Sequence, residues 1–564
     1  MSALAHNPSE PIENLAIGKI IEVDGSHLIA ELDPMVSELS RVYAGETYPI
    51  GQFGSILKVH FGRRLIYALV GRLRMKSELQ AERGVALAPS SDERIVEADL
   101  FGEGEWIRGK SGDWVLCFER GVSTYPLPQQ TVYLTPKNEL RSIYSNSTGA
   151  TIQLGWHVGS GGTPCLADLN ELLGKHTAIL GSTGSGKSAA VAAIVHSILE
   201  RGTAAKYEKW KPRIIILDPH AEYGNAFVEH TRLSTDDGTL KLPYWLLSFQ
   251  ETVSLLVGKT EFVATSQANI VKSALMSARA EGAGLIGLDS PITIDSPVPY
   301  KLSTLRAKIE ASKPDQASKQ DSHNSILQKL EVLMTDERYK FMMTEWSGNH
   351  EDLPPEAIRQ LLGDGPQPRI IDLSGVPNEI AGVSSAVIAR TLFNMKIWQT
   401  QSERENNPVL LVCEEAHRYV PNRGEAQYEA AQEAIRRIAK EGRKYGIGLL
   451  LVSQRPSEVE ATVLSQCNSW IVLRITNDAD CEYVRSILPD SMSGLTKMLS
   501  GLRRQEAIFV GQAAMLPSRI LIRNLKPEQL PRSNDIDFDK GWQSDVLSDS
   551  QIGEVVKRWR YQRR

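Results

Sequence analysis

Eight consecutive residues, GSTGSGKS from Gly181 to Ser188, place glycines, hydroxyl side chains and a lysine at the spacing GxxxxGK[ST]. In such a loop the glycines let backbone N–H groups wrap a phosphate, and the following helix adds its positive end. Lys187 is expected to reach the β- and γ-phosphates, and Ser188 to bind Mg²⁺. An apolar stretch, HTAIL, precedes the loop, and a helical stretch, AAVAAIVHSILE, follows it. A glycine-rich turn without a ligand is the alternative. The sequence favours a nucleoside triphosphate site formed by Gly181, Thr183, Gly184, Ser185, Gly186, Lys187, Ser188 and Ala189.

A phosphate loop needs carboxylates on a second strand, for Mg²⁺ and for water. The run VLLVCEEAH places Glu414 and Glu415 directly after an apolar stretch. Glu414 is expected to hold the Mg²⁺ shell through water, and Glu415 to polarise the attacking water. Many P-loop enzymes have Asp-Glu here, so the Glu-Glu pair leaves the contact of Glu414 open. The alternative is a solvated helix start with acidic residues near its N-terminus.

Two further polar residues follow in the chain. Gln454 lies at the tip of another apolar run, LLLVSQ, where a polar side chain can sense the γ-phosphate. The basic segment AIRRIAKEGRKYG contains Arg443 just before that run. In a ring ATPase an arginine of one subunit stabilises charge at the site of its neighbour, and Arg443 is the candidate. A solvated basic helix face and phosphate contacts to nucleic acid remain alternatives.

The composition is that of an ordinary globular protein with several domains. The 564 residues are 41% hydrophobic and 23% charged, with a net charge of −5, so any nucleic-acid surface must be local. No apolar run approaches the ~18 residues of a membrane span. The five cysteines lie far apart without a CxxC pair, which argues against a zinc site or a disulfide framework. The N-terminal stretch lacks the pattern of a secretory signal. We therefore expect a cytoplasmic protein without membrane association.

The apolar pattern divides the chain into parts of different character. Short β-branched runs separated by turn residues fill about the first 160 residues and indicate a small barrel or sandwich. Later apolar runs without alternation are typical of strands buried on both faces of a parallel sheet. They alternate with helical segments, so we expect an α/β core. A helical, polar stretch interrupts this core. The predicted domains are a barrel (1–160), the first core part (161–250), a helical insertion (251–365), the second core part (366–525) and a C-terminal extension (526–564).

Seven motifs in order give the sequence a family resemblance. HTAILGSTGSGKS, DPHAEY, LPYWLL, DLSGV, EEAHRYVP, EGRKYGIGLLLVSQRPSEV and QCNSWIVLRITNDAD resemble the HerA family of hexameric DNA-translocating ATPases, within the HerA–FtsK group. The resemblance covers about residues 10–525. It implies a RecA-like P-loop ATPase core, an N-terminal small β-barrel of the ATP synthase type and a helical insertion. It also implies a homo-hexamer with duplex DNA in a central channel, and ATP as the nucleotide.

The resemblance assigns roles to individual residues and suggests a partner. It implies Glu415 as the catalytic carboxylate, Gln454 as the sensor and Arg443 as a finger acting across the subunit interface. Asp218 and Glu222, in DPHAEY, are plausible supporting residues, although a plain turn explains Asp218 equally well. HerA proteins usually act with a partner, so we expect a nuclease or a sirtuin-type effector docked on the barrel end. Anti-phage defence and DNA end processing are the settings expected.

Two functions of different class follow from these observations. The first is an ATP-driven motor for duplex DNA. The second is a nucleotide-gated ring scaffold that assembles and activates an effector enzyme with little translocation of its own. The chain contains no nuclease constellation of its own. DNA-stimulated ATP turnover would separate the two.

Overall fold

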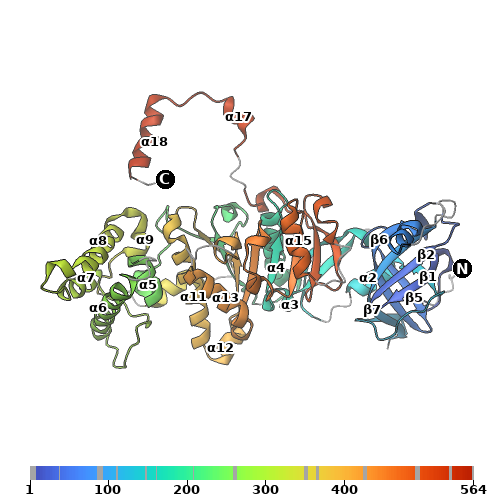
Figure 1. The fold of residues 1–564 in the computed structure, drawn as a ribbon, viewed down its shortest axis with the longest axis horizontal. Coiled ribbons are helices and arrows are strands. Elements are labelled where there is room, and N and C mark those ends of the chain that lie inside the picture. The colour runs from blue at the N-terminus through green and yellow to red at the C-terminus, as the bar shows by residue number, and fades with distance from the viewer. Residues whose placement is uncertain are drawn as a thin grey trace. The chain divides into compact units, whose positions relative to one another are not determined.

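The protein is seen here in a computed structural model, and its fold is drawn in Figure 1. The chain divides into two compact units. Unit 1 comprises residues 1–201, 454–457 and 467–524, and unit 2 comprises residues 202–453, 458–466 and 525–564. The described residues are 8–36, 38–84, 93–109, 112–145, 149–160, 162–207, 209–257, 263–348, 354–363, 367–422, 429–488, 496–532 and 536–561.

Unit 1 begins with a closed β-barrel, whose strands are blue in Figure 1. Six strands run in the order β2-β1-β9-β5-β6-β7, and β2 also pairs with β7, which closes the ring. Closure leaves no free edge among these strands. Their inward side chains form one apolar core, in which Leu57, Val59 and Ile66 are fully buried. The barrel strands are β1 (Ala16–Asp24), β2 (His27–Leu32), β5 (Ile56–Phe61), β6 (Arg64–Met75), β7 (Arg94–Arg108) and β9 (Thr131–Leu134).

Smaller elements accompany the barrel. The strand β8 (Trp114–Arg120) extends the sheet beyond β7, and β3 (Ser40–Tyr43) forms a hairpin with β4 (Glu46–Pro49). Two short helices, α1 (Lys76–Glu82) and α2 (Lys137–Ser145), lie between strands.

The rest of unit 1 is a mixed sheet that carries the phosphate loop. Its strands run in the order β11-β10-β20-β19-β18-β12, and only β12 and β18 are parallel to each other. The apolar run before the phosphate loop forms β12, and all four of its residues are buried. The strands are β10 (Thr151–His157), β11 (Thr163–Asp168), β12 (Thr177–Leu180), β18 (Ser469–Leu473), β19 (Glu506–Gly511) and β20 (Ser518–Ile522), and the helices are α3 (Leu169–Gly174), α4 (Lys187–Ala204) and α15 (Asp478–Ile487).

Unit 2 contains a parallel sheet in the order β17-β16-β13-β15-β14. Every residue of β16 and β17 is buried, as expected for strands covered on both faces. The helices α11 and α13 contact each other, and the Phe393 ring meets the Tyr445 ring edge-on at 5.4 Å. The elements are β13 (Arg213–Asp218), β14 (Thr231–Ser234), β15 (Arg369–Asp372), β16 (Val409–Cys413), β17 (Ile447–Ser453), α10 (Pro354–Leu362), α11 (Asn378–Trp398), α12 (Gln401–Asn406), α13 (Glu429–Tyr445) and α14 (Ala461–Leu464).

The helical insertion lies between β14 and β15 in the chain and is green to yellow in Figure 1. A capping box starts its first helix, because the side chains of Ser248 and Glu251 each accept an N–H of the other residue. Glu251 is buried and forms an ion pair of 2.7 Å with Arg390 of α11, which anchors the insertion. The insertion helices are α5 (Phe249–Leu256), α6 (Val263–Leu285), α7 (Leu302–Ala311), α8 (Asp321–Thr335) and α9 (Lys340–Met343).

The chain ends in two short helices, α17 (Phe538–Trp542) and α18 (Asp549–Tyr561), neither of which buries a residue. None of the helices in the described part of the chain combines the length and hydropathy that crossing a membrane would need. The fold class expected from the sequence is confirmed: an α/β core with an N-terminal β-barrel and a helical insertion.

Candidate functional site

The phosphate loop connects the end of β12 to the start of α4. Gly184 and Gly186 have φ angles of +73° and +104°, which side chains rarely tolerate. Gly181 is required for a different reason, since a Cβ there would lie 2.9 Å from the Cβ of Leu473. The glycines of the motif therefore meet specific backbone and packing requirements of this loop.

Polar groups inside the loop are arranged as a ligand site requires. Ser185 is fully buried, and its hydroxyl oxygen has no hydrogen-bond partner within the described chain. Such a group is costly to bury, so a ligand oxygen would relieve it. The Lys187 Nζ donates to the carbonyl of Ser182 at 3.2 Å, which keeps the ammonium against the loop. Thr183 is exposed, while Ser188 and Ala189 are half-buried in the first turn of α4.

Gln454 lies beside the phosphate loop, and both belong to unit 1. The Thr183 hydroxyl donates to the Gln454 side-chain oxygen at 2.7 Å. A change in the loop can therefore reach Gln454 directly.

The sequence reasoning missed two supports of the loop. The backbone N–H of Thr476, after β18, donates to the Ser182 hydroxyl at 3.1 Å. On the other side, the backbone N–H of Gln505 donates to the Ser185 carbonyl at 3.2 Å, and Gln505 has a φ of +68°. These contacts come from segments about 300 residues away, 294 for Thr476 and 320 (505 − 185) for Gln505, and no local signal marks them.

Glu414 and Glu415 follow β16 in unit 2. Glu414 is buried and accepts a hydrogen bond from the Tyr223 hydroxyl. Burial raises the pKa of Glu414 to about 8, against the lowering effect of the Tyr223 hydrogen bond. Tyr223 is a residue that the sequence reasoning missed. Its side chain competes for the carboxylate that we expected to hold the Mg²⁺ shell.

The backbone of Glu415 is left-handed, with a φ of +53°, which costs a non-glycine residue about 1–2 kcal/mol. Its side chain is 10% exposed. The carboxylate oxygen Oε2 lies 3.2 Å from Nδ1 of His417, and the two atoms do not form a hydrogen bond. The same Nδ1 is 3.3 Å from the Ser453 hydroxyl at the end of β17. Strain of this kind is typical of functional positions.

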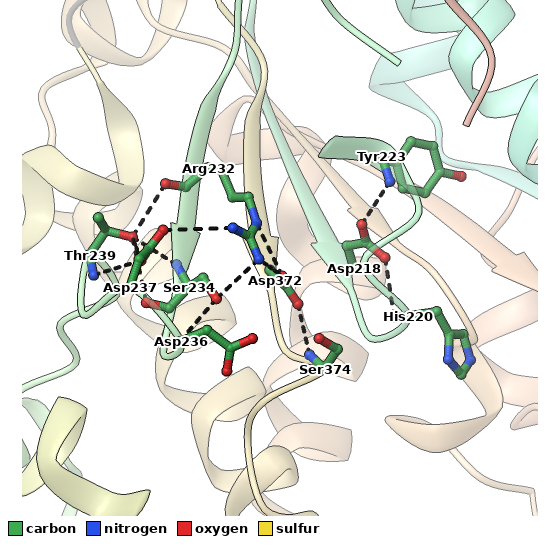
Figure 2. Close-up of polar contacts among 10 residues, drawn as sticks. All are labelled: Asp218, His220, Tyr223, Arg232, Ser234, Asp236, Asp237, Thr239, Asp372 and Ser374. Carbon is green, nitrogen blue, oxygen red and sulfur yellow. Dashed lines mark hydrogen bonds and ion pairs between the residues drawn. The ribbon is translucent and has the colours of Figure 1, made fainter. Parts of the chain in front are cut away.

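Two buried aspartates, Asp218 and Asp372, lie at the same edge of the parallel sheet, where β13 and β15 end (Figure 2). Asp218 ends β13 and accepts backbone N–H groups from His220 and Tyr223, at 3.2 and 2.9 Å. Asp372 ends β15, is fully buried and pairs with Arg232 at 2.6 Å. Burial raises the pKa of Asp218, partly offset by the N–H donors. Both aspartates are thus bound by protein donors, and Asp218 closes the turn that positions Tyr223.

Arg443 lies near the C-terminal end of α13 and is exposed. Its neighbours are engaged within the helix layer: Arg436 pairs with Glu460 at 2.9 Å, and Arg437 lies 4.7 Å from the centre of the Phe393 ring. Within the described chain, Arg443 forms no hydrogen bond or ion pair. Its guanidinium is available for a ligand or a second chain.

The predicted site residues thus form two groups, one in each unit. The phosphate-loop residues and Gln454 lie together in unit 1. Glu414 and Glu415 lie side by side in unit 2, with Arg443 apart from them on α13.

The donor set suits Mg²⁺, which prefers oxygen ligands and usually keeps several waters. Among the described residues no cluster of three or more His, Cys, Asp or Glu side chains could hold a metal alone. Ser188 offers a hydroxyl beside the phosphate position, and Glu414 offers a carboxylate that must first be ionised. A divalent ion would therefore need the oxygens of a bound triphosphate.

Comparisons with known proteins identify relatives. Residues 152–392 match the model of the family described as helicase HerA, central domain. A probable helicase of Methanocaldococcus jannaschii is 28% identical over 480 residues, covering 81% of this chain and 86% of the relative. The DNA double-strand break repair helicase HerA of Pyrococcus furiosus is 26% identical over 428 residues, covering 70% and 73%. Among solved structures, VirB4 of Thermoanaerobacter pseudethanolicus aligns with a TM-score of 0.49 and 16% identity, covering 68% and 98%.

Proposed function

We propose that this chain, which belongs to the HerA family and is an NTP-hydrolysing enzyme, uses ATP to translocate duplex DNA as a hexameric ring. The observation that carries the proposal is the phosphate loop, in a chain of this family. The loop has positive-φ glycines and a buried Ser185 hydroxyl that no described residue hydrogen-bonds. Relatives named as DNA repair helicases support DNA as the substrate of the motor.

In this proposal the residues of unit 1 bind the triphosphate. Backbone N–H groups from Gly181 to Ala189 surround the phosphates, and Lys187 neutralises charge on the β- and γ-phosphates. Mg²⁺, held by Ser188 and by Glu414 through water, would supply charge neutralisation at the phosphates. Gln454 reads the state of the γ-phosphate, and its contact with Thr183 supports this role.

The residues of unit 2 supply the chemistry of hydrolysis. Glu415 accepts a proton from the attacking water as the water oxygen bonds to the γ-phosphorus, while the bond from that phosphorus to the β–γ bridging oxygen breaks and ADP leaves. Arg443 contacts the γ-phosphate in the neighbouring subunit and stabilises charge in the transition state. Its exposure and its lack of an ion pair in the described chain support this assignment. A basic helix face that contacts DNA phosphates is the competing role for Arg443.

We further propose that the ring acts with an effector, a nuclease or a sirtuin-type enzyme, on the barrel. DNA end processing or anti-phage defence would be its setting. A nucleotide-gated scaffold is the second candidate, favoured by the net charge of −5, which does not suggest a nucleic-acid-binding protein.

The test is steady-state ATP hydrolysis by the purified chain, with and without linear duplex DNA, with Glu415→Gln as the blank. Native mass spectrometry of the same sample gives the number of chains. Strong stimulation by DNA of a six-membered assembly supports the motor. ATP turnover that is indifferent to DNA refutes the motor and favours the scaffold.

A further inference from the structure

His417 is a residue of the EEAH motif to which the proposed function gives no role. It lies in a short 3-10 helix, Ala416–Arg418, directly after the two glutamates. Its side chain is only 13% exposed. The ring therefore faces the protein, and its contacts there decide what it does.

The ring nitrogen Nδ1 faces two groups at once. The Glu415 Oε2 atom lies 3.2 Å away, and the Ser453 hydroxyl oxygen lies 3.3 Å away. The first neighbour is local in sequence, since Glu415 is two residues earlier. The second neighbour is distant in sequence and is brought close by the fold, since Ser453 is the last residue of β17. Ser453 is 1% exposed. One N–H at Nδ1 can therefore be shared between the Glu415 carboxylate and the Ser453 hydroxyl.

Glu415 needs such a partner. Its Oε2 atom is buried and has no hydrogen bond from any described residue. A buried carboxylate oxygen without a donor is unfavourable. The left-handed backbone at Glu415 limits where its side chain can go. The His417 ring lies within ion-pair distance of the Glu415 carboxylate. A small ring movement would complete the hydrogen bond.

We propose that His417 is a positioning residue for Glu415, whose Nδ1–H orients the carboxylate and ties it to the end of β17. This inference rests on the proposed role of Glu415 as the group that accepts the proton of water. Ser453 immediately precedes Gln454, the residue that contacts Thr183 of the phosphate loop. The orientation of Glu415 is thereby linked to the end of β17, which directly precedes Gln454 in the chain.

The test compares kcat and KM for ATP in the full chain with His417→Ala, His417→Asn and Ser453→Ala. A side-chain amide of asparagine places an N–H close to the position of Nδ1, so His417→Asn is the matched conservative variant. Loss of a hydrogen bond to a charged group predicts that His417→Ala lowers kcat about 10- to 100-fold. KM should stay within about twofold, His417→Asn should recover most of kcat, and Ser453→Ala should lower kcat by a few-fold.

Several results would overturn the inference. Equal losses in His417→Ala and His417→Asn would indicate a packing role, as would a rise in KM at unchanged kcat. Wild-type kcat in His417→Ala or in Ser453→Ala would remove the positioning role or the link to β17, respectively. Fluorescent-nucleotide binding confirms that each variant is folded.

Glu415→Gln separates this inference from the proposed function. If Glu415→Gln retains turnover, the proposed catalytic role of Glu415 fails, and the inference fails with it. If Glu415→Gln is inactive while His417→Ala is fully active, only the inference fails.

Discussion

Replacing Lys396 with methionine should remove one contribution to the pH dependence of the unfolding free energy of this protein. Lys396 lies in the last turn of α11 and is 1% exposed. Its ammonium donates to the carbonyl of Asn407, and no carboxylate of the described chain forms an ion pair with it. Burial, and then the charge of Arg213, lowers the pKa of Lys396 from 10.5 to about 8.

The sign follows from where the proton is bound. Below pH 8 the lysine is charged in both the folded and the unfolded chain, and folding carries the full cost of burying the charge. Between pH 8 and 10.5 the unfolded chain keeps the proton and the folded chain releases it, so stability rises with pH. At ~1.4 kcal/mol per pKa unit, the wild-type protein gains about 3 kcal/mol across this range.

Methionine fills a similar volume without the charge. Lys396→Met leaves the Asn407 carbonyl without its donor, which costs about 1–3 kcal/mol. Near pH 7 the variant avoids the cost of burying the lysine charge, and this gain balances or outweighs the lost hydrogen bond. The variant should therefore be as stable as the wild-type protein or up to about 2 kcal/mol more stable. Above pH 10 it should be the less stable of the two.

Urea unfolding at several pH values from 7 to 10.5 measures the effect as the difference in unfolding free energy between variant and wild type. Tyrosines and cysteines that titrate in this range are common to both proteins and cancel in the difference. Lys396→Arg is the control that stays charged throughout. A difference for Lys396→Met that stays constant with pH would refute the argument.

Three further experiments test the site. Lys187→Ala should weaken ATP binding by about 10- to 100-fold, since it removes charge-assisted contacts to phosphate, and isothermal titration calorimetry checks this; unchanged affinity would contradict the assignment. Arg443→Ala should lower ATP turnover by ~10³-fold or more, and mixing it with Glu415→Gln subunits should restore some turnover if the arginine acts across the interface; no rescue in mixed rings would exclude that role. Thr183→Val and Gln454→Leu should show a coupling of about 0.5–1.5 kcal/mol in kcat/KM by a double-mutant cycle; additive effects would mean that their hydrogen bond has no role in turnover.

The amino-acid sequence by itself determined the parts of this protein that depend on short-range pattern. The loop from Gly181 to Ser188 could be recognised because its glycines are needed locally, at positive φ in Gly184 and Gly186. The strands β12, β16 and β17 could be predicted because continuous apolar runs are typical of strands buried on both faces. The class of fold followed from the alternation of such runs with helices.

Only the tertiary structure decided which side chains meet. The barrel closes because β2 pairs with β7. In this pairing His27 lies opposite Asp99, 72 residues away in the chain. Tyr223 reaches Glu414 across 191 residues, and Thr183 reaches Gln454 across 271. Residue type and local spacing set what a side chain can do, but hydrogen-bond partners depend on strand order in the sheet. No local pattern encodes that order, because it is fixed by the packing of the whole core.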